Sequence, residues 1–237
     1  HVSNVINLSI SNSLFLSEEF KKLNFIVAFT HDIGKATCFF QKYLKESCNN
    51  LPSKKSKLTN HSLIGGLAGL YISDKVFDND FHKMLCFIIP KRHHSDLNDI
   101  FNDLNIKEEE KEILIKQIDS INKEKFLTFK ENLKSMINDQ KYCPIIDLFN
   151  LDEFKHFVNC KADKKLKEIQ KFLLLKPTSI DNFLEIIITY SILLDSDKSD
   201  AGVGFNKISE LKSCQVDLSP SIVESFLTRL NERNKLG

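Results

Sequence analysis

The spacing of apolar residues along the chain predicts helices almost throughout. Between Ser17 and His31, Phe20, Leu23 and Val27 recur at intervals of three and four residues, which is the spacing of one helix face. Ser17 is placed to cap this helix. One further step of four residues from Val27 reaches His31, so we expect this imidazole to face the interior from the end of the helix.

A second, short helix is expected after Gly34, a residue that lets the backbone turn away from the first helix. Thr37 can cap it. Its buried face is predicted to consist of Phe40, Tyr43 and Leu44. The polar, lysine-rich segment 51–60 that follows is predicted to be a loop.

A third helix, capped by Asn60 and opened by His61, carries several glycines among its apolar residues. Each glycine costs about 1 kcal/mol in a helix interior. The use of Gly65, Gly66 and Gly69 therefore suggests that another backbone passes very close. Such tight packing would bring His61 toward the end of the first helix.

The apolar run 84–89 is too continuous to lie at the surface, and Pro90 follows it. We expect the chain to leave the helix at this proline and to reorient. The segment beyond it contains His93 and His94. Neighbouring side chains diverge there, which would let both imidazoles approach one ion from different sides.

Another strongly apolar helix is predicted from about residue 183 to residue 194, introduced by the polar residues 177–179. It should end at Asp195 and Asp197. A carboxylate that closes so apolar a helix is costly to bury without a partner, and a metal ion is the obvious partner. We take Asp197 as the candidate ligand and Asp195 as the alternative. Residues 219 and 220 are predicted to open a last, amphipathic helix.

Composition limits the class of protein. A chain of 237 residues with 42% apolar content can bury a full core, and we expect one domain over residues 1–237, although two are allowed. Because the net charge is only +1, any binding of a polyanion must depend on a local basic patch or on metal ions. Six scattered cysteines suit reduced thiols, and no apolar run reaches the roughly 18 residues of a membrane span. A soluble, cytoplasmic protein is therefore expected.

Histidine is scarce, with 7 in 237 residues, so its pattern here is informative. Imidazoles and carboxylates from separate helices predict a metal centre. The candidate ligands from this pattern are His31, Asp32, His61, His93, His94 and Asp197. His82 and His156 are instead expected to be ordinary packed side chains. Ligation rich in nitrogen favours manganese, iron, cobalt, nickel or zinc over magnesium.

The string HDIGKATCFFQKYL, from His31 to Leu44, resembles the signature of the HD nuclease domain of the type I CRISPR interference helicase-nuclease. Further motifs follow in the family's order at His61-Ser62, His93-His94 and the DKSDA string 197–201. The resemblance covers nearly the whole chain and implies an all-α HD-domain bundle with a metal site between core helices. One departure is Ser95, which stands where the family usually has glycine.

The resemblance implies two metal ions and assigns their ligands. One ion would be held by His1, His31, Asp32 and Asp197. The other would be held by His61, His93 and His94, with Asp32 bridging. Two such ions can activate water for an in-line attack at phosphorus. Lys35, one turn from Asp32, resembles a family lysine that neutralises the phosphate. Because His1 is the first residue, we expect further native sequence upstream.

The same resemblance implies single-stranded DNA as substrate, cut endonucleolytically after a helicase has unwound it, with a CRISPR RNA-guided surveillance complex as a further partner. No helicase motif follows before Gly237, so the chain is expected to be a fragment of a fusion or a stand-alone subunit. Candidate phosphate contacts flank the site at Lys54, Lys55, Lys57, Lys91 and Arg92, although the lysine-rich background makes ordinary solvated lysines an equal alternative.

Two other functions stay open at this point. One is an HD-type phosphohydrolase that acts on nucleotides or cyclic dinucleotides, which would share the metal cage but need a closed pocket with nucleoside-specific contacts. The other is a non-catalytic interaction module that retains the fold. Such a module would normally have lost ligands, and none of the expected ligands is missing here.

Overall fold

Twelve α-helices build the part of the chain that the structure, a computed structural model, describes: residues 1–49, 56–97, 100–176 and 179–203. They are α1 (Val2–Asn12), α2 (Glu18–Thr30), α3 (Cys38–Cys48), α4 (Ser62–Val76), α5 (Asp80–Arg92), α6 (Ile100–Asp103), α7 (Glu108–Asp119), α8 (Lys123–Met136), α9 (Cys143–Asp147), α10 (Leu151–Cys160), α11 (Ala162–Leu175) and α12 (Ile180–Val203). Three short 3-10 helices are η1 (Ile33–Ala36), η2 (Lys57–Thr59) and η3 (Gln140–Tyr142). These ranges contain no strand, so the predicted all-α class is confirmed.

The chain divides into two compact units, His1–Ala201 and Gly202–Gly237. The first unit contains every candidate site residue and is described below. The second lies almost wholly outside the described ranges, as does the helix predicted from residue 219.

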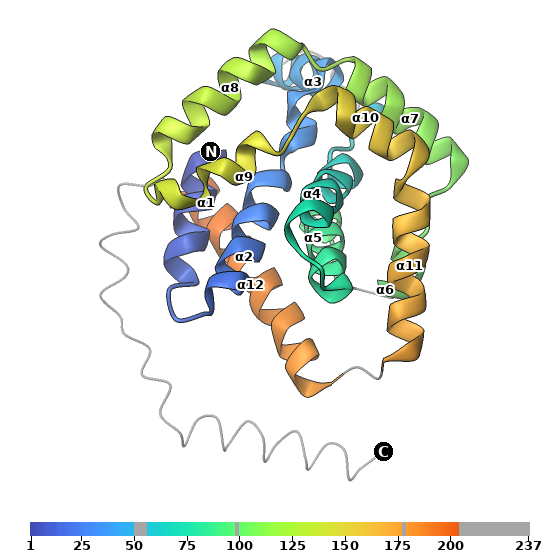
Figure 1. The fold of residues 1–237 in the computed structure, drawn as a ribbon. Coiled ribbons are helices and arrows are strands. Elements are labelled where there is room, and N and C mark those ends of the chain that lie inside the picture. The colour runs from blue at the N-terminus through green and yellow to red at the C-terminus, as the bar shows by residue number, and fades with distance from the viewer. Residues whose placement is uncertain (50–55, 98–99, 177–178, 204–237) are drawn as a thin grey trace, which may run out of the picture. The chain divides into compact units, whose positions relative to one another are not determined.

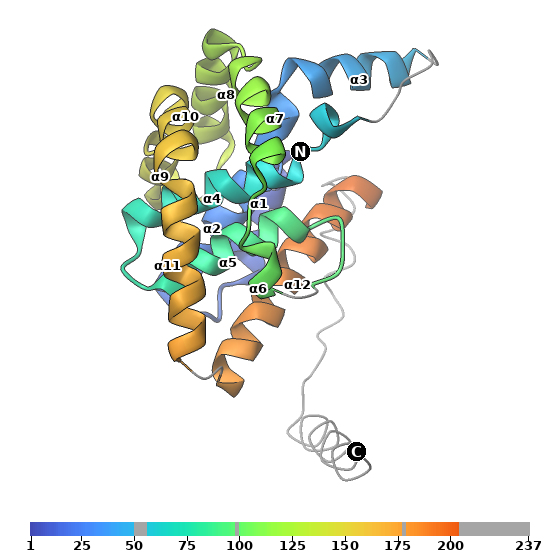
Figure 2. The same cartoon turned by 90° about the vertical axis from the view of Figure 1, so that its right-hand side faces the viewer.

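Three helices, α2, α4 and α5, form the centre of the first unit (Figure 1). Helix α1 packs on α2, and α11 packs on α5. Figure 2 shows α10 and α11 on one side of the central helices and α12 on the other. The apolar core lies between these helices and includes Phe25, Phe29 and Phe87. The candidate ligands lie on or next to the same helices.

Helix α2 forms as its pattern predicts. The Ser17 hydroxyl accepts a hydrogen bond from the Phe20 amide, which satisfies one of the free N–H groups of the first turn. The apolar residues Leu23 and Val27 are fully or almost fully buried. This face continues into His31, which directly follows the last helical residue.

Helix α3 follows the prediction only at its start. The Thr37 hydroxyl accepts from the Phe40 amide, and Phe40 is buried. The predicted buried face is wrong at Leu44, which is 39% exposed, and Tyr43 is only partly buried. The reason is that α3 projects away from the central helices, so they cover only its first turn (Figure 2).

The predicted loop 51–60 and the start of α4 are partly described. Residues 50–55 lie outside the described ranges, and Lys57–Thr59 form η2 instead of a plain loop. Helix α4 begins one residue later than expected, at Ser62, so His61 occupies the cap position. Asn60 still contributes, because its side-chain oxygen accepts a hydrogen bond from the Ser62 amide at 3.1 Å.

The prediction that the helix ends before Pro90 is wrong, because α5 runs through the proline to Arg92. Proline has no N–H to offer the carbonyl four residues earlier, that of Cys86. Gly69 of α4 packs against this carbonyl oxygen, and a Cβ atom at position 69 would overlap it. The close passage of backbones that the glycines predicted is thus present, and the proline lies within the tightest contact.

The predicted end of the apolar helix at Asp195–Asp197 is also wrong. Helix α12 continues to Val203, since no helix breaker stands at 195–198 and Asp197 and Asp200 form polar contacts one turn apart on the same side. Its start at Ile180 follows the predicted polar segment, of which residues 177 and 178 lie outside the described ranges.

The five described cysteines are free thiols, and Cys214 lies outside the described ranges. Among the described residues, none of the helices combines the length and apolar character that a membrane crossing requires.

Candidate metal centre

His31 and Asp32 stand at the end of α2, inside the protein. Their relative exposures are 0% and 3%, in line with the predicted inward direction. The His31 Nδ1 donates to the Ala28 carbonyl oxygen at 2.7 Å, a bond that holds the ring and turns the Nε2 lone pair toward the site. Asp32 then leads into η1, which carries Lys35.

Gly34 has a different role from the one its sequence suggested. It lies within η1 and does not adopt the left-handed backbone of a helix-ending glycine. A Cβ atom here would lie 2.7 Å from the His61 Cβ and 2.8 Å from the His61 Cα, and would overlap Ile64. Gly34 therefore allows the start of α4 to approach η1. The approach places the His61 Nε2 3.2 Å from the Asp32 Oδ1.

His93 and His94 follow α5 at the turn after Arg92. The His93 Nδ1 donates to the Pro90 carbonyl oxygen at 2.6 Å, so its Nε2 faces the site in the same way as that of His31. The His93 Nε2 lies 3.7 Å from the Asp32 Oδ1, and the His94 Nε2 lies 2.9 Å from the His61 Nε2. Both imidazoles reach the same donor group, but their ring centroids lie only 3.8 Å apart, so the prediction that these neighbouring side chains diverge is wrong.

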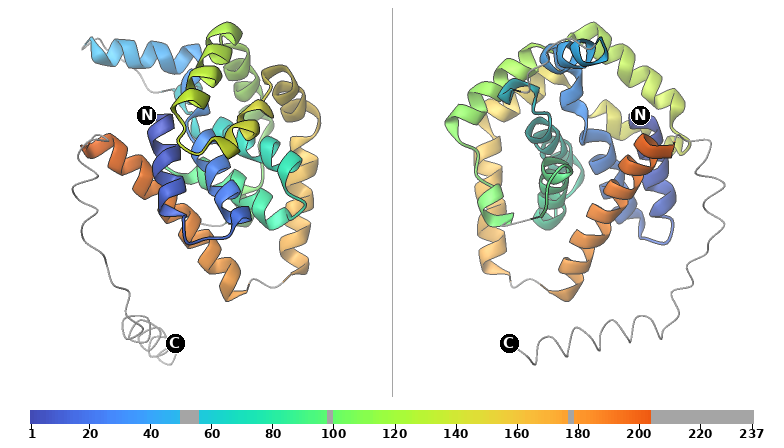
Figure 3. Two further views of the ribbon diagram at one scale, coloured as in Figure 1. Left: turned by 60° about the vertical axis from the view of Figure 1, so that its left-hand side comes forward. Right: turned by 180° about the vertical axis from the view of Figure 1, so that it is seen from behind.

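The N-terminus and α12 close the cluster from the other side. Figure 3 shows the start of α1 beside the C-terminal part of α12. The His1 Nε2 lies 3.1 Å from both the Asp32 Oδ2 and the Asp197 Oδ1. Asp195, the alternative ligand, instead accepts a hydrogen bond from Asn12 at 2.9 Å. Of the two aspartates, Asp197 alone belongs to the cluster.

All seven predicted ligands therefore meet in one place, as two donor groups. One group is Asp32, His61, His93 and His94, and the other is His1, His31, Asp32 and Asp197. Within each group the candidate ligand atoms all lie within 4.8 Å of one another. Asp32 belongs to both groups, with Oδ1 near His61 and Oδ2 near His1. His82 and His156 lie elsewhere: His82 is buried and contacts Glu19 as a packed side chain, whereas His156 is exposed, so the prediction of packing is wrong for His156.

The donor set fits a metal ion. Metal–ligand bonds of about 2.0–2.1 Å place neighbouring ligand atoms about 3.0–3.4 Å apart. Four of the separations around Asp32 and His1 lie in this range, from 3.1 to 3.4 Å. The His93 Nε2 is buried and has no hydrogen-bond partner among the described residues, and the buried Asp32 carboxylate is surrounded by the Lys35 ammonium group and by imidazole nitrogens. Because an unpaired buried polar atom is costly and these nitrogens and oxygens converge, a cation is a fitting partner for the cluster. This buried cluster could hold a metal ion.

Electrostatics differ between the two groups. Close contacts with the Asp197 and Asp32 carboxylates raise the pKa of His1 to about 10. Burial lowers the pKa of His31, but the same two carboxylates outweigh burial and raise it to about 9. In return, His1 and His31 hold the pKa of Asp197 well below its usual range. This half of the cluster is a network of mutually stabilised charges.

The paired histidines behave in the opposite way. Burial, with the positive charge of His31, lowers the pKa of His93 to about 3. Burial and the neighbouring His61 also lower the pKa of His94. Both imidazoles are therefore neutral near pH 7, which is the form that binds metal ions. Asp32 is also ionised, because His1, His31 and His61 outweigh the effect of its burial and hold its pKa far below the usual range.

Cationic side chains near the cluster fall into two kinds. The Lys35 Nζ lies 2.6 Å from the Asp32 Oδ2, directly at the centre. Arg92 and Lys91 both bind Asp103 of α6, and Lys57 is exposed and 3.9 Å from Glu109. These three of the predicted phosphate contacts thus face carboxylates. Lys54 and Lys55 lie outside the described ranges.

Sequence reasoning missed two groups that hold the ligands in place. The Asp200 Oδ2 accepts from the His1 Nδ1 at 2.6 Å, and its Oδ1 accepts from the Asn4 amide at 2.8 Å. The Tyr190 hydroxyl donates to the Ser95 carbonyl oxygen at 2.7 Å, next to the paired histidines. Asp200 could have been found, because it lies one helical turn from Asp197 on the same face. No local signal relates Tyr190 to a turn 95 residues earlier.

Models of protein families, curated proteins and solved structures were compared with this chain, and none of them matches it.

The Asp200–His1 pair leads to a first prediction. Asp200→Ala should weaken the binding of manganese or cobalt at the His1 group about 10- to 100-fold, because the carboxylate orients the ring and makes it more basic. Isothermal titration calorimetry with the metal salt alone measures the change. Asp195→Ala is the matched control, since Asp195 lies on the same helix but binds Asn12. Equal affinities in the two variants would show that Asp200 does not position His1.

Proposed function

We propose that this chain is a metal-dependent phosphodiesterase that acts as a single-stranded DNA endonuclease in CRISPR interference. The observation that carries the proposal is the meeting of His1 and the separate histidine and aspartate motifs around one buried carboxylate, Asp32. A helical scaffold that gathers this donor set suits hydrolysis at phosphorus. The order of the motifs, which resembles that of the HD nuclease domain, supports the choice of substrate.

Two divalent transition-metal ions are the proposed cofactors, with manganese, iron, cobalt and nickel as candidates. The two donor groups together offer five imidazoles and two carboxylates, a set that magnesium disfavours. When bound, such ions supply an activated water and stabilise both the attacking and the leaving oxygen of an in-line displacement.

The chain's own residues provide the rest. Asp32 directs one oxygen to each donor group, so it would fix the position of the two groups relative to each other. His31 and His93 are fixed through backbone carbonyls and need no reorganisation to ligate. The Lys35 ammonium group, 2.6 Å from the Asp32 Oδ2, is placed to pair with a phosphate oxygen as negative charge develops on it.

The surroundings of the centre favour a polymer over a small nucleotide. His1, Asp32 and Lys35 line one cavity of about 790 Å³. His61, His94 and again Lys35 line a second cavity, of about 1020 Å³. A strand held at the centre could therefore place nucleotides in both cavities. A phosphohydrolase for mononucleotides would instead enclose its substrate on one side.

The proposed partners follow from the same function. A protein of net charge +1 has no strong field that attracts DNA, so a helicase domain or subunit would deliver the strand to it. The CRISPR RNA-guided surveillance complex would in turn recruit that helicase. This setting places the protein in the cytoplasm.

The test is a matrix of metals and substrates. Purified protein is stripped of metal, reloaded with manganese, cobalt, nickel, iron or magnesium, and offered single-stranded DNA, duplex DNA, RNA, nucleotides and cyclic dinucleotides. We expect cleavage of single-stranded DNA, including circular single strands, with at least one transition metal and less with magnesium. Hydrolysis of nucleotides or cyclic dinucleotides without cleavage of single-stranded DNA would contradict the proposal and favour the phosphohydrolase.

A further inference from the structure

The cavity on the His1 side of the centre has an unusual wall. It lies between α3 and η1 on one side and α8 on the other, and we call it the α3–α8 cavity. Its apolar lining comes from Val2, Phe29, Ile33, Ala36, Leu44, Ile121, Phe126 and Phe129. His1, Asp32 and Lys35 form its inner end, so the apolar surface reaches the candidate metal centre directly.

Part of this apolar surface is only partly covered within the described protein. Leu44 falls on the apolar face of the α3 pattern, yet it is 39% exposed and faces the cavity. On the opposite wall, Phe129 is only partly buried and lies beside the buried Phe126, with ring centroids 5.8 Å apart. An apolar side chain on each wall, next to a hydrolytic centre, is the arrangement of a ligand subsite.

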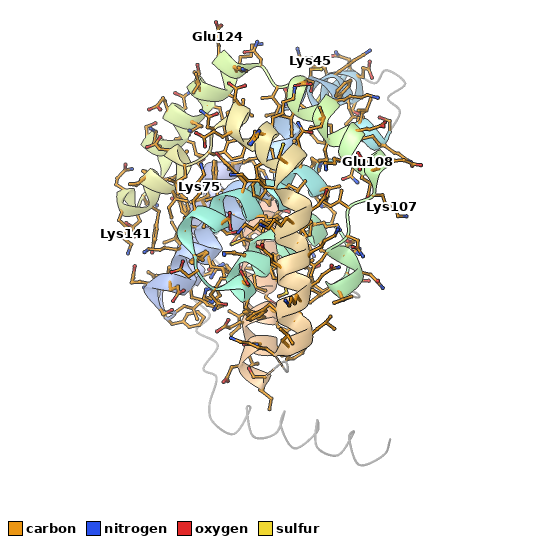
Figure 4. All side chains as sticks on the ribbon, turned by 45° about the vertical axis from the view of Figure 1, so that its right-hand side comes forward. Lys45, Lys75, Lys107, Glu108, Glu124 and Lys141 are labelled. Carbon is orange, nitrogen blue, oxygen red and sulfur yellow. The ribbon has the colours of Figure 1, made fainter. Side chains whose placement is uncertain are left out.

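The charges of the lining indicate what kind of ligand enters. Of the charged residues that line the cavity, Lys35 pairs with Asp32 and Lys42 with Glu46, and Lys45 and Lys125 are two further cations. Figure 4 labels Lys45 on α3 and Glu124 at the start of α8, both near the top of the view. A ligand with an apolar, flat part and several negative charges complements this surface. A nucleotide within a nucleic-acid strand has both properties.

We propose that the α3–α8 cavity binds one unpaired nucleobase, that of the nucleotide next to the scissile phosphate. The inference rests on the proposed nuclease function and deepens it. The base would lie against the Phe129 ring and the Leu44 side chain, with its phosphate at Lys35 and the centre, and the next phosphates along the lysines. A volume of about 790 Å³ admits a nucleoside.

The proposal gives a physical reason for a single-stranded substrate. In a duplex each base is stacked and paired, so a base can enter a side cavity only after it has been unstacked, at a cost of a few kcal/mol. A single strand presents its bases without this cost. The α3–α8 cavity therefore selects for unpaired nucleotides at the cleavage position, independently of any base sequence.

The test compares two variants and two strands. Leu44→Gln and Phe129→Leu alter the two walls, and Leu127→Gln is the matched control, since Leu127 is 60% exposed on α8 but does not line the cavity. Each protein, loaded with the same metal, is offered a single-stranded oligodeoxynucleotide and an equally long strand of abasic deoxyribose phosphates. The ratio of the two kcat/KM values measures the contribution of the bases.

Wild type and Leu127→Gln should cleave the normal strand about tenfold more efficiently than the abasic one, as stacking of one base predicts. Leu44→Gln and Phe129→Leu should lose most of this preference yet cleave the abasic strand as well as wild type does. Equal preference in all four proteins would overturn the base subsite and leave the nuclease intact. If no protein cleaves either strand with any metal, the proposed function fails, and the inference fails with it.

Discussion

Asp32→Asn should abolish the proposed phosphodiesterase activity, with a loss of about a thousandfold or more in kcat. Asp32 is the one residue that belongs to both donor groups, and its two oxygens face different imidazoles. The amide keeps the size of the side chain but offers a single, neutral oxygen. Both proposed ions would lose a charged ligand, and we expect stabilisation of the transition state by several kcal/mol to depend on them.

Single-turnover cleavage of single-stranded DNA at saturating metal measures this effect, together with a metal titration. Asp195→Asn serves as the control, because Asp195 lies near the centre on α12 but pairs with Asn12. It should retain full activity. Circular dichroism must show that Asp32→Asn is folded, since the change leaves His1 and Lys35 without their shared carboxylate. A folded Asp32→Asn protein with wild-type activity would contradict the mechanism.

The histidines of the two donor groups differ in protonation before any metal binds, and this difference affects metal binding by each group. Without metal, His1 and His31 are protonated near pH 7 and pair with Asp32 and Asp197, so a metal ion must displace their protons. His93, with its pKa lowered to about 3, has no proton to lose. His93 and His94 are therefore better prepared to ligate at neutral pH than His1 and His31.

Much of the candidate centre could be predicted because its signals are local. The apolar face of α2 ends at His31, and this predicts the inward direction of that ring. The glycines of α4 predict a close contact with another backbone, although they do not identify it. The cost of burying a carboxylate on so apolar a helix indicated Asp197 or Asp195 as a ligand, although the helix continues to Val203 and only the structure separates the two. Each of these arguments uses residues within one or two turns of each other.

The parts that could not be predicted depend on distant contacts. Helix α5 passes through Pro90, and Gly69 of another helix packs against the carbonyl that proline leaves free. The exposure of Leu44 follows from the projection of α3, and the apolar pattern alone cannot distinguish a core face from a cavity wall. Tyr190 holds the Ser95 turn from another helix.

Gly34→Ala should damage the centre without touching a single candidate ligand. Its Cβ atom would lie 2.7 Å from the His61 Cβ and would overlap Ile64, so η1 and the start of α4 must separate. The Asp32–His61 contact of 3.2 Å would then open, and both metal affinity and cleavage should fall about a hundredfold. The free energy of unfolding should fall by about 1–3 kcal/mol, the usual cost of overpacking.

The sign of the change in the free energy of unfolding distinguishes overlap with α4 from free space at position 34. Gly34 does not adopt a left-handed backbone, so alanine would raise stability by about 0.5–1 kcal/mol if the space were free. Gly202→Ala is the matched control: a Cβ atom there meets no described atom within 4 Å, and this change should stabilise the helix. Chemical denaturation and metal titration measure both variants. If Gly34→Ala is stabilised like Gly202→Ala and binds metal like wild type, the contact between η1 and α4 does not set the spacing of the centre.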